Sequence, residues 1–439
     1  MTKYVIAHHI PKTAEGTYYT VPFPIGEGLE RVEVSYSYPR SDASPAVVDL
    51  GLMDWDKRFL GWSGSDKPSV FVGACSATPG YMMTELVSGE WHIIVGAYKI
   101  PDTGLDVRYE ITYTPQRPRW LVGDLHVHSD ASDGQHDIST LVKKARKIGL
   151  DFIAVANHNN YSENLALPKV PDFTLIPAVE WTHYRGHMNF FGVAAPFENF
   201  IANTEEEMLE LIAKAKAKGA LISVNHPKDP GCPYLWESLD CFDTVEVWNA
   251  PMRKSNMDAI AWWHKLTAGS GSNTDDMHVS PHARLEAGSG LPVVRKVPLI
   301  GGSDYHRNFH PAMLGHPVTY VYAKSASVAD ILDALRKGNA YVSATTHGPR
   351  LELYCDGAMM GCSVPWHGGL ELMANAENLG IGMELQLVTS GGVAHTWRRG
   401  QLPARVEVQP GWRFAYLVAR RRVLSFQRVA AISNPVYFL

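Results

Sequence analysis

The chain is poor in cysteine and has no paired-cysteine motif. Its five cysteines are scattered through 439 residues, and none of them is spaced as CxxC. This pattern argues against a disulfide framework and against a thiolate zinc finger. We therefore expect reduced thiols and a cytoplasmic protein. The five positions are Cys75, Cys232, Cys241, Cys355 and Cys362.

Long apolar runs and an excess of one charge are also missing. No run approaches the roughly eighteen apolar residues of a membrane-spanning helix, and Met1–His9 lacks the apolar core of a secretory leader. Forty basic residues against forty-five acidic ones leave a formal charge of −5, which is unsuited to coating nucleic acid. We expect neither a membrane nor a nucleic-acid partner. The composition is compatible with a homo-oligomer.

Several familiar catalytic motifs are absent. The chain contains no Walker A sequence, no GxGxxG after a strand-like run and no GxSxG elbow, since Gly61–Gly64 has the wrong spacing. A serine or cysteine nucleophile therefore has little support. Histidine, in contrast, is abundant, with 19 residues.

Turn and periodicity signals divide the chain into three parts. Residues 1–116 read as a β-sandwich-like domain, because alternating apolar runs such as Val32–Tyr38 are separated by Gly and Pro turns. Residues 119–345 alternate between strand-like and helix-like segments. Residues 346–439 return to β-rich sequence, either as a separate sandwich or packed with the N-terminal sheet.

The central part predicts an α/β barrel. Helical stripes begin after Asp137, after Thr204 with Glu207 as a capping box, and after Ser327. Alternating βα units favour parallel strands, so we expect a distorted (βα)7 TIM-like barrel flanked by the two β-sandwich-like segments. Its chemistry should lie at the C-terminal ends of the strands. The strand-like runs are 120–128, 152–158, 174–181, 188–193, 221–225, 244–248 and 297–301.

A Gly/Ser-rich insertion interrupts the barrel at residues 265–296. Such a segment is either a surface loop or a lid over the site. The sequence leaves both readings open.

Candidate metal ligands follow almost every strand of the barrel. His126 with His128, and Asp304 with His306, stand at i and i+2 after apolar runs, and such positions face the same side of a strand. Each pair can therefore hold one ion. Further candidates at strand ends or in the next loop are Asp133, His158, Glu180, His187 and His226.

Imidazole and carboxylate ligands without cysteine favour Zn, Mn or Fe. These ligands are too many for one ion, so we expect two or three divalent metal ions, with Glu180 bridging two of them. A water bridging two ions becomes a hydroxide nucleophile near neutral pH. The pattern predicts a metal-dependent hydrolase that cleaves an ester, with Glu180, Asp304 and His306 as its catalytic residues.

The choice of ester stays open. Arg185, Lys228 and Arg307 lie near the ligand motifs and either pair with a phosphate or are plain surface charge. His183 either faces the substrate or supports a ligand. Aromatic residues, which are either core or contacts for an aromatic leaving group, are Trp181, Tyr184, Trp236, Trp248 and Tyr305. We expect a small-molecule ester substrate, either a phosphoester or a carbamate or carboxyl ester.

The motifs resemble those of the PHP (polymerase and histidinol phosphatase) superfamily. His126-Val127-His128 resembles its HxH motif, Asn225-His226-Pro227 its third motif and Asp304-Tyr305-His306 its DxH motif. The resemblance implies three ion sites in a distorted barrel. They would use His126, His128, Glu180 and Asp304; then Glu180, His187 and His226; and then Asp133, His158 and His306.

The resemblance extends to the CehA/McbA-like branch of that superfamily. The phrases that carry it include 49–52, 61–64, 78–81 and 89–91 before the barrel, 180–183 and 186–189 within it, and 432–435 near the end. Named members of this branch hydrolyse carbamate esters of aromatic alcohols. The alternative is a non-catalytic carbohydrate- or polymer-binding protein with a relic barrel, which the complete ligand set disfavours.

Overall fold

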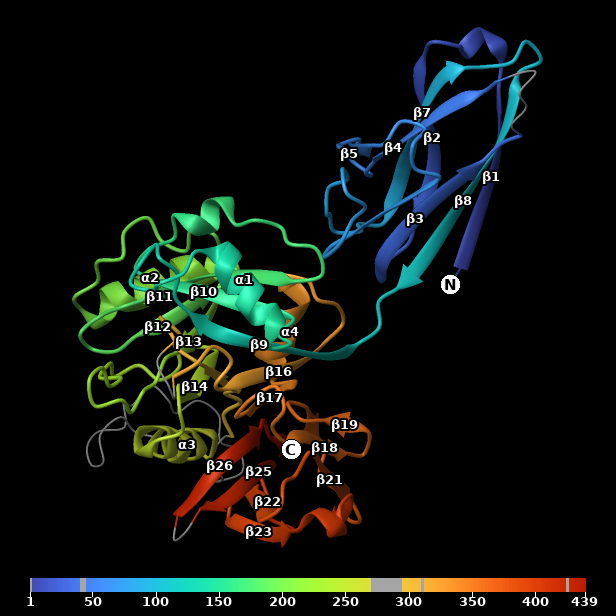
Figure 1. Cartoon of the computed structure of the whole chain (residues 1–439). Helices are drawn as coiled ribbons and strands as arrows, with labels where there is room; N and C mark the ends of the chain where they lie inside the picture. Colours follow the sequence, from blue (N-terminus) through green and yellow to red (C-terminus); the bar gives the residue numbers. More distant parts are fainter. Residues whose placement is uncertain (1, 40–44, 270–293, 309–311, 424–425) are drawn as a thin grey trace. The chain divides into compact units, whose positions relative to one another are not determined.

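The computed structural model describes residues 2–39, 45–269, 294–308, 312–423 and 426–439, in two compact units (Figure 1). The first unit comprises Met1–Pro118 with the short stretches Lys169–Asp172 and Lys324–Ser327. The second comprises the remaining residues, from Arg119 to Leu439. The division at Pro118 lies close to the boundary expected at residue 116.

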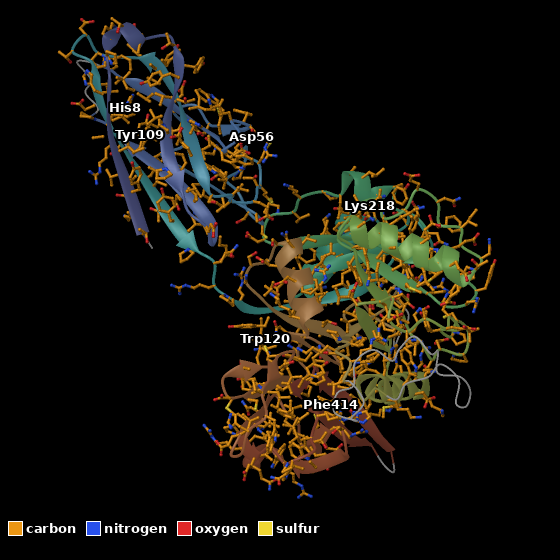
Figure 2. All side chains as sticks on the ribbon, turned by 180° about the vertical axis from the view of Figure 1, so that it is seen from behind. His8, Asp56, Tyr109, Trp120, Lys218 and Phe414 are labelled. Atoms are coloured by element: carbon orange, nitrogen blue, oxygen red, sulfur yellow. The ribbon has the colours of Figure 1, made fainter. Side chains whose placement is uncertain are left out.

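The first unit consists of two four-stranded antiparallel sheets, in the orders β1-β8-β3-β6 and β2-β7-β4-β5. Alternate residues such as Val32 and Val34 face inward and share one core with Trp91 and Tyr109 (Figure 2). The strands are β1 (Thr2–Ile10), β2 (Tyr18–Ile25), β3 (Leu29–Ser37), β4 (Val47–Met53), β5 (Phe59–Trp62), β6 (Ser69–Gly73), β7 (Gly89–Lys99) and β8 (Leu105–Pro115).

The second unit is built on a large mixed sheet that begins with the strands of the expected barrel. Strands β9, β10 and β11 are parallel neighbours, as are β13, β14 and β15, while β12 runs antiparallel between β11 and β13. A bridge between Val127 and Tyr305 brings the two ends of this set together. The strands are β9 (Arg119–Val127), β10 (Phe152–His158), β11 (Thr174–Trp181), β12 (Met188–Phe191), β13 (Leu221–Val224), β14 (Thr244–Asn249) and β15 (Leu299–Gly302).

The fold is mixed α/β, but the helices of the described residues are too few to confirm the distorted (βα)7 barrel that we expected. Within the described residues, α-helices connect β9 to β10, β12 to β13 and β14 to β15, and a fourth follows β16. The β11–β12 connection is a hairpin, which explains the antiparallel strand. The helices are α1 (Ile138–Lys147), α2 (Glu205–Ala217), α3 (Lys254–Thr267) and α4 (Val328–Lys337).

Local signals place α1, α2 and α4 as expected. The Asp137 carboxylate caps α1 by accepting a hydrogen bond from the Thr140 amide. Thr204 and Glu207 form the expected capping box of α2.

The insertion expected at 265–296 begins inside α3, and its residues 270–293 lie outside the described residues. No helix among the described residues is both long and apolar enough to span a membrane.

Four of the C-terminal strands continue the sheet that begins at β9, whereas residues 346–439 were expected either as a separate sandwich or packed with the N-terminal sheet. Strand β9 pairs with β16 (Val318–Ala323), β16 with β17 (Ala340–Ser343), and β17 with β26 (Phe426–Ser433). The order then runs β26-β25-β22-β23 (Figure 1). These strands are β22 (Met383–Thr389), β23 (Gly392–Trp397) and β25 (Phe414–Val423).

Smaller strands complete the C-terminal part. A four-stranded sheet has the order β19-β18-β21-β24, and β20 pairs with β27, which pairs with β25. The strands are β18 (Arg350–Cys355), β19 (Ala358–Met359), β20 (Ser363–Val364), β21 (Glu371–Glu377), β24 (Ala404–Glu407) and β27 (Val436–Phe438).

One apolar core joins the barrel to these strands. Trp263 of α3 meets Tyr416 of β25 edge-on, with ring centroids 5.1 Å apart. Phe414, labelled in Figure 2, is fully buried in the same core as Val245 of β14. The C-terminal strands therefore support the face of the barrel that α3 covers.

Asn434 fastens this arrangement through buried hydrogen bonds. Its Oδ1 accepts from the Leu299 amide at 2.7 Å, and its Nδ2 donates to the carbonyls of Leu299 and Ala340 at 3.1 and 2.9 Å. The residue is fully buried. It links the end of β26 to both β15 and β17.

We predict that Asn434→Ala destabilises the second unit by about 3 kcal/mol, because it leaves buried backbone groups without partners. Denaturant unfolding followed by tryptophan fluorescence measures the change. Asn203→Ala, at an exposed position, is the matched control. Equal stability of the two variants would contradict this role for Asn434.

Candidate metal centre

The C-terminal ends of the parallel strands bring the predicted ligands to one edge of the sheet. His126 and the adjoining His128 belong to β9, His158 ends β10 and Glu180 lies in β11. His187 precedes the antiparallel strand β12, so it reaches the same edge. The last three ligands follow β13 and β15, and are His226, Asp304 and His306.

An inner group forms around His126, His128 and Asp304. The Asp304 Oδ1 lies 3.1 Å from His128 Nε2 and 3.5 Å from His126 Nε2. Glu180 approaches the same two rings, at 3.4 and 3.5 Å. Both histidines are fully buried. The i, i+2 spacing on β9 thus turns both rings to one side, as expected.

A second group forms around the Glu180 Oε1 oxygen, which also faces His126. This oxygen lies 3.1 Å from His187 Nδ1 and 3.3 Å from His226 Nε2. The structure adds Cys232, whose Sγ lies 3.3 Å from His226 Nδ1 and which can complete a metal-binding group with both histidines. The expected ligand set contained no cysteine, so Cys232 is a candidate that the sequence analysis did not include.

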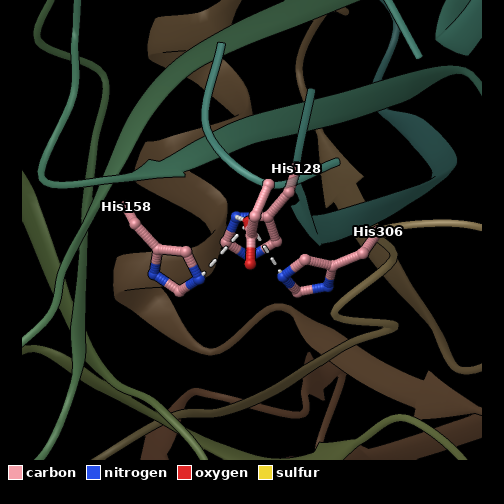
Figure 3. Close-up of side chains that lie close together, drawn as sticks. His128, His158 and His306 are labelled. Atoms are coloured by element: carbon pink, nitrogen blue, oxygen red, sulfur yellow. Dashed lines mark ion pairs between the residues drawn. The ribbon is translucent and has the colours of Figure 1, made fainter. Parts of the chain in front are cut away.

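An outer group gathers His128, Asp133, His158 and His306 (Figure 3). The Asp133 Oδ1 lies 3.2 Å from His306 Nε2, 3.6 Å from His158 Nε2 and 3.8 Å from His128 Nδ1. The side chains of His158 and His306 are 28% and 27% exposed, and that of Asp133 is 57% exposed. This group is therefore more open to solvent than His126, His128 and Glu180, which are buried, whereas Asp304 of the inner group is 25% exposed.

The buried polar atoms of the centre fit divalent cations. Among the described residues, buried atoms without a hydrogen bond include His126 Nε2, both ring nitrogens of His128, Glu180 Oε2 and Asp304 Oδ1. Burying such groups without partners is costly. A divalent ion held by these nitrogens and oxygens would satisfy them together. The structure and chemistry therefore indicate divalent metals at this edge.

Electrostatics keep the carboxylates ionised. Burial raises the pKa of Glu180, but the attraction of His126 and hydrogen bonds from neighbouring histidines outweigh it and hold that pKa well below its ordinary value. The pKa of Asp304 is likewise raised by burial, but attraction to His126 and His128 holds it well below its ordinary value. Both groups thus present full negative charge to a cation.

Four of the eight described non-glycine residues with positive φ angles lie at the same strand ends. Asn159, His226, Ala250 and Asp304 adopt positive φ angles of 47°, 29°, 52° and 52°. Each lies at or directly after a position that holds a site residue. Residues other than glycine pay for this conformation, and such strain accumulates at functional sites. At His226 and Asp304 it turns a ligand side chain toward the centre.

Three of the residues expected to bind substrate contact tryptophan side chains. The guanidinium of Arg185 lies over the Trp236 ring at 4.3 Å, and His183 stacks against Trp181 with ring centroids 5.3 Å apart. Lys228 Nζ lies 5.3 Å from the centroid of Trp262. These three side chains are therefore engaged with tryptophan side chains.

Arg307 occupies a different position. It lines a pocket of about 290 Å³ together with Asp304, Tyr305, His306 and Ala312. The pocket therefore touches two of the predicted ligands directly. A larger cavity of about 500 Å³ lies in the C-terminal sheet and is lined by residues such as Tyr354, Glu371 and Arg405, none of them a predicted ligand.

Some polar residues of the centre were not predicted from the sequence. Besides Cys232, the buried side chains of Asn225, Glu246 and Asn249 contact predicted ligands. Glu246 could have been identified from the sequence as a candidate, because it is a carboxylate between Val245 and Val247 in an apolar run. A charge at such a position needs a partner.

Comparison with known proteins agrees with this geometry. Residues 124–225 match the family model of the PHP domain. The matched stretch runs from β9 to the end of β13, so it includes the HxH histidines and Glu180. The motifs at His226 and Asp304 lie beyond it, and the structure adds them to the same edge.

Two solved structures show weaker similarity. One is a two-domain protein from Bacteroides vulgatus containing a predicted PHP-like metal-dependent phosphoesterase, with 16% identity, a TM-score of 0.40, and coverage of 73% of this chain and 96% of that one. The other is a candidate metal-dependent phosphoesterase from Bifidobacterium adolescentis, with 17% identity, a TM-score of 0.27, and coverage of 44% and 90%. No curated protein matches the chain.

We predict that acidification releases bound metal, because protons and ions compete for the same imidazole lone pairs. Burial lowers the pKa values of His126 and His226, but neighbouring groups, including Glu180 and Glu246, outweigh it and raise both. These rings therefore take up protons above the ordinary value of about 6.5. As the pH is lowered, the zinc content measured by elemental analysis after equilibration should begin to decrease before the pH reaches this ordinary value. Unchanged content down to about pH 5 would contradict the prediction.

Proposed function

We propose that the protein is a metal-dependent hydrolase that cleaves an ester bond of a small-molecule substrate. The observation that carries this proposal is the set of buried, unpartnered ligand atoms from His126, His128, Glu180 and Asp304 at one edge of the sheet. The match to the PHP domain supports it. In a relic barrel that bound no cation, nothing would offset the free-energy cost of burying these polar groups without partners.

The chain's own residues define the roles in this reaction. Divalent ions, when bound, supply Lewis acidity that activates water and polarises an ester oxygen. Glu180 stands between the inner and second groups and can be shared by two ions. Asp304 and His306 belong to the inner and outer groups and also line the pocket, so they place the substrate beside the ligands.

Within this class we favour a phosphoester over a carbamate of an aromatic alcohol. Arg307 brings a guanidinium into the pocket, where it can pair with a phosphate oxygen. Of the aromatic residues considered for an aromatic group, Trp181, Trp236 and Trp248 are buried in the core. The other two are Tyr184, which is exposed, and Tyr305, which lines the pocket. Membership of the CehA/McbA-like branch, with its carbamate substrates, is the second candidate.

We predict that His128→Ala and Asp304→Ala lower kcat by about 10³-fold or more, because each removes a ligand and with it several kcal/mol of transition-state stabilisation. The assay uses zinc- or manganese-loaded protein with p-nitrophenyl phosphate, bis-p-nitrophenyl phosphate and a naphthyl carbamate. His367→Ala, an exposed histidine outside the centre, is the control. Near wild-type turnover of either variant, or no hydrolysis of any ester by loaded wild type, would contradict the proposal.

We predict that Arg307→Ala raises KM for the phosphate substrates by about 10- to 100-fold, since a hydrogen bond to a charged group contributes about 1.5–3 kcal/mol. Hydrolysis of a neutral carbamate should change little. Arg399→Ala removes an exposed arginine outside the pocket and serves as the control. Equal effects of Arg307→Ala on charged and neutral esters would argue against phosphate recognition.

A further inference from the structure

Strand β14 supplies no predicted ligand, yet it places two buried polar side chains behind the centre. Glu246 and Asn249 are each only 1% exposed. Neighbouring strands β13 and β15 flank β14 on both sides. A buried carboxylate in such a strand needs a specific set of donors to offset its desolvation.

Glu246 finds those donors on the metal ligands themselves. One oxygen lies 3.0 Å from His126 Nδ1, and the other accepts from the His226 amide at 3.1 Å. When His126 Nδ1 donates a hydrogen bond to this carboxylate, Nε2 is the ring nitrogen left to bind a metal, and it faces Glu180 and Asp304.

Asn249 extends the same network to a third strand. Its Nδ2 donates to Glu246 at 3.2 Å and to Asp304 Oδ2 at 3.3 Å. Its Oδ1 accepts from Arg253 at 3.3 Å, which sets the orientation of the amide. With Oδ2 held in this way, Asp304 presents Oδ1 to His126 and His128.

The outer group is held by a different network. Asn157 Oδ1 accepts from the Ser129 amide and the Ser132 hydroxyl, both at 2.9 Å, and so holds the loop that carries Asp133. Glu163 in turn accepts from Asn157 Nδ2 at 3.0 Å and from the Ser129 hydroxyl. The two groups thus have separate supports, Glu246 with Asn249 for the inner group and Asn157 with Glu163 for the outer group.

We propose that Glu246, acting with Asn249, is a positioning residue that makes the inner group, His126, His128, Glu180 and Asp304, the tightest metal position of the centre. The outer position, with its exposed Asp133, exchanges its ion more readily. This inference rests on the metal centre of the proposed function. Hydrogen bonds from metal-binding histidines to carboxylates raise the basicity of the ring and fix its direction.

The test titrates Zn²⁺ into the metal-free full chain in competition with a chromophoric chelator, which resolves tight and weak sites without any substrate. Wild type should show a first ion bound more tightly than the rest. Glu246→Gln should lower the affinity for that first ion by about 10- to 100-fold. The reason is that the NH2 group of the glutamine would face a hydrogen-bond donor where Glu246 presents an accepting oxygen. Asn249→Ala should shift the same ion in the same direction.

Glu163→Gln is the matched variant, since it makes the same chemical change in the support of the outer group. It should weaken a later ion and leave the first one unchanged. Circular dichroism establishes that each variant is folded. If Glu246→Gln does not fold, Asn249→Ala decides the question by the same readout.

The possible failures are distinguishable. A wild-type chain that binds no zinc would remove the metal centre, and with it both the proposed function and this inference. A wild type with a tight first ion that Glu246→Gln and Asn249→Ala leave unchanged would overturn only the role of β14. Equal weakening of every ion by Glu246→Gln would also overturn it, because that result indicates a general structural effect.

Discussion

The burial of carboxylates and imidazoles that face one another is the constraint on which the site depends. Glu180 and Asp304 are held ionised next to His126 and His128, and the facing atoms lack hydrogen bonds among the described residues. Such an arrangement loses hydration without regaining it from protein groups. The fold holds these carboxylates and imidazoles in place in spite of the cost of desolvation. It does so through parallel strands that end at one edge and through positive φ angles at His226 and Asp304.

Much of the ligand set could be predicted because two residues at i and i+2 on a strand point their side chains to the same face of the sheet. His126 and His128 share one side of β9, as the period of two requires. Cys232 could not be predicted, since its approach to His226 depends on the path of a loop. Glu246 and Asn249 reach their partners only across neighbouring strands, and pairing between strands is not encoded in local spacing.

In the fold, too, features set by neighbouring residues could be predicted, whereas contacts between distant residues could not. Helices α1, α2 and α4 follow from amphipathic stripes and, for α1 and α2, caps, which act within a few residues. Helix α3 was missed because its Trp262 and Trp263 are typical of strands as well as of cores. The pairing of β17 with β26 joins residues about ninety positions apart, and apolar alternation alone does not choose a partner strand.

The gradient of burial across the centre gives the proposed reaction a direction. His126 and His128 are buried at the inner end, whereas Asp133, His158 and His306 are partly exposed at the outer end. The pocket with Arg307 opens beside Asp304 and His306, which belong to the inner and outer groups. A substrate that entered this pocket would meet Asp304 and His306 before the fully buried His126 and His128.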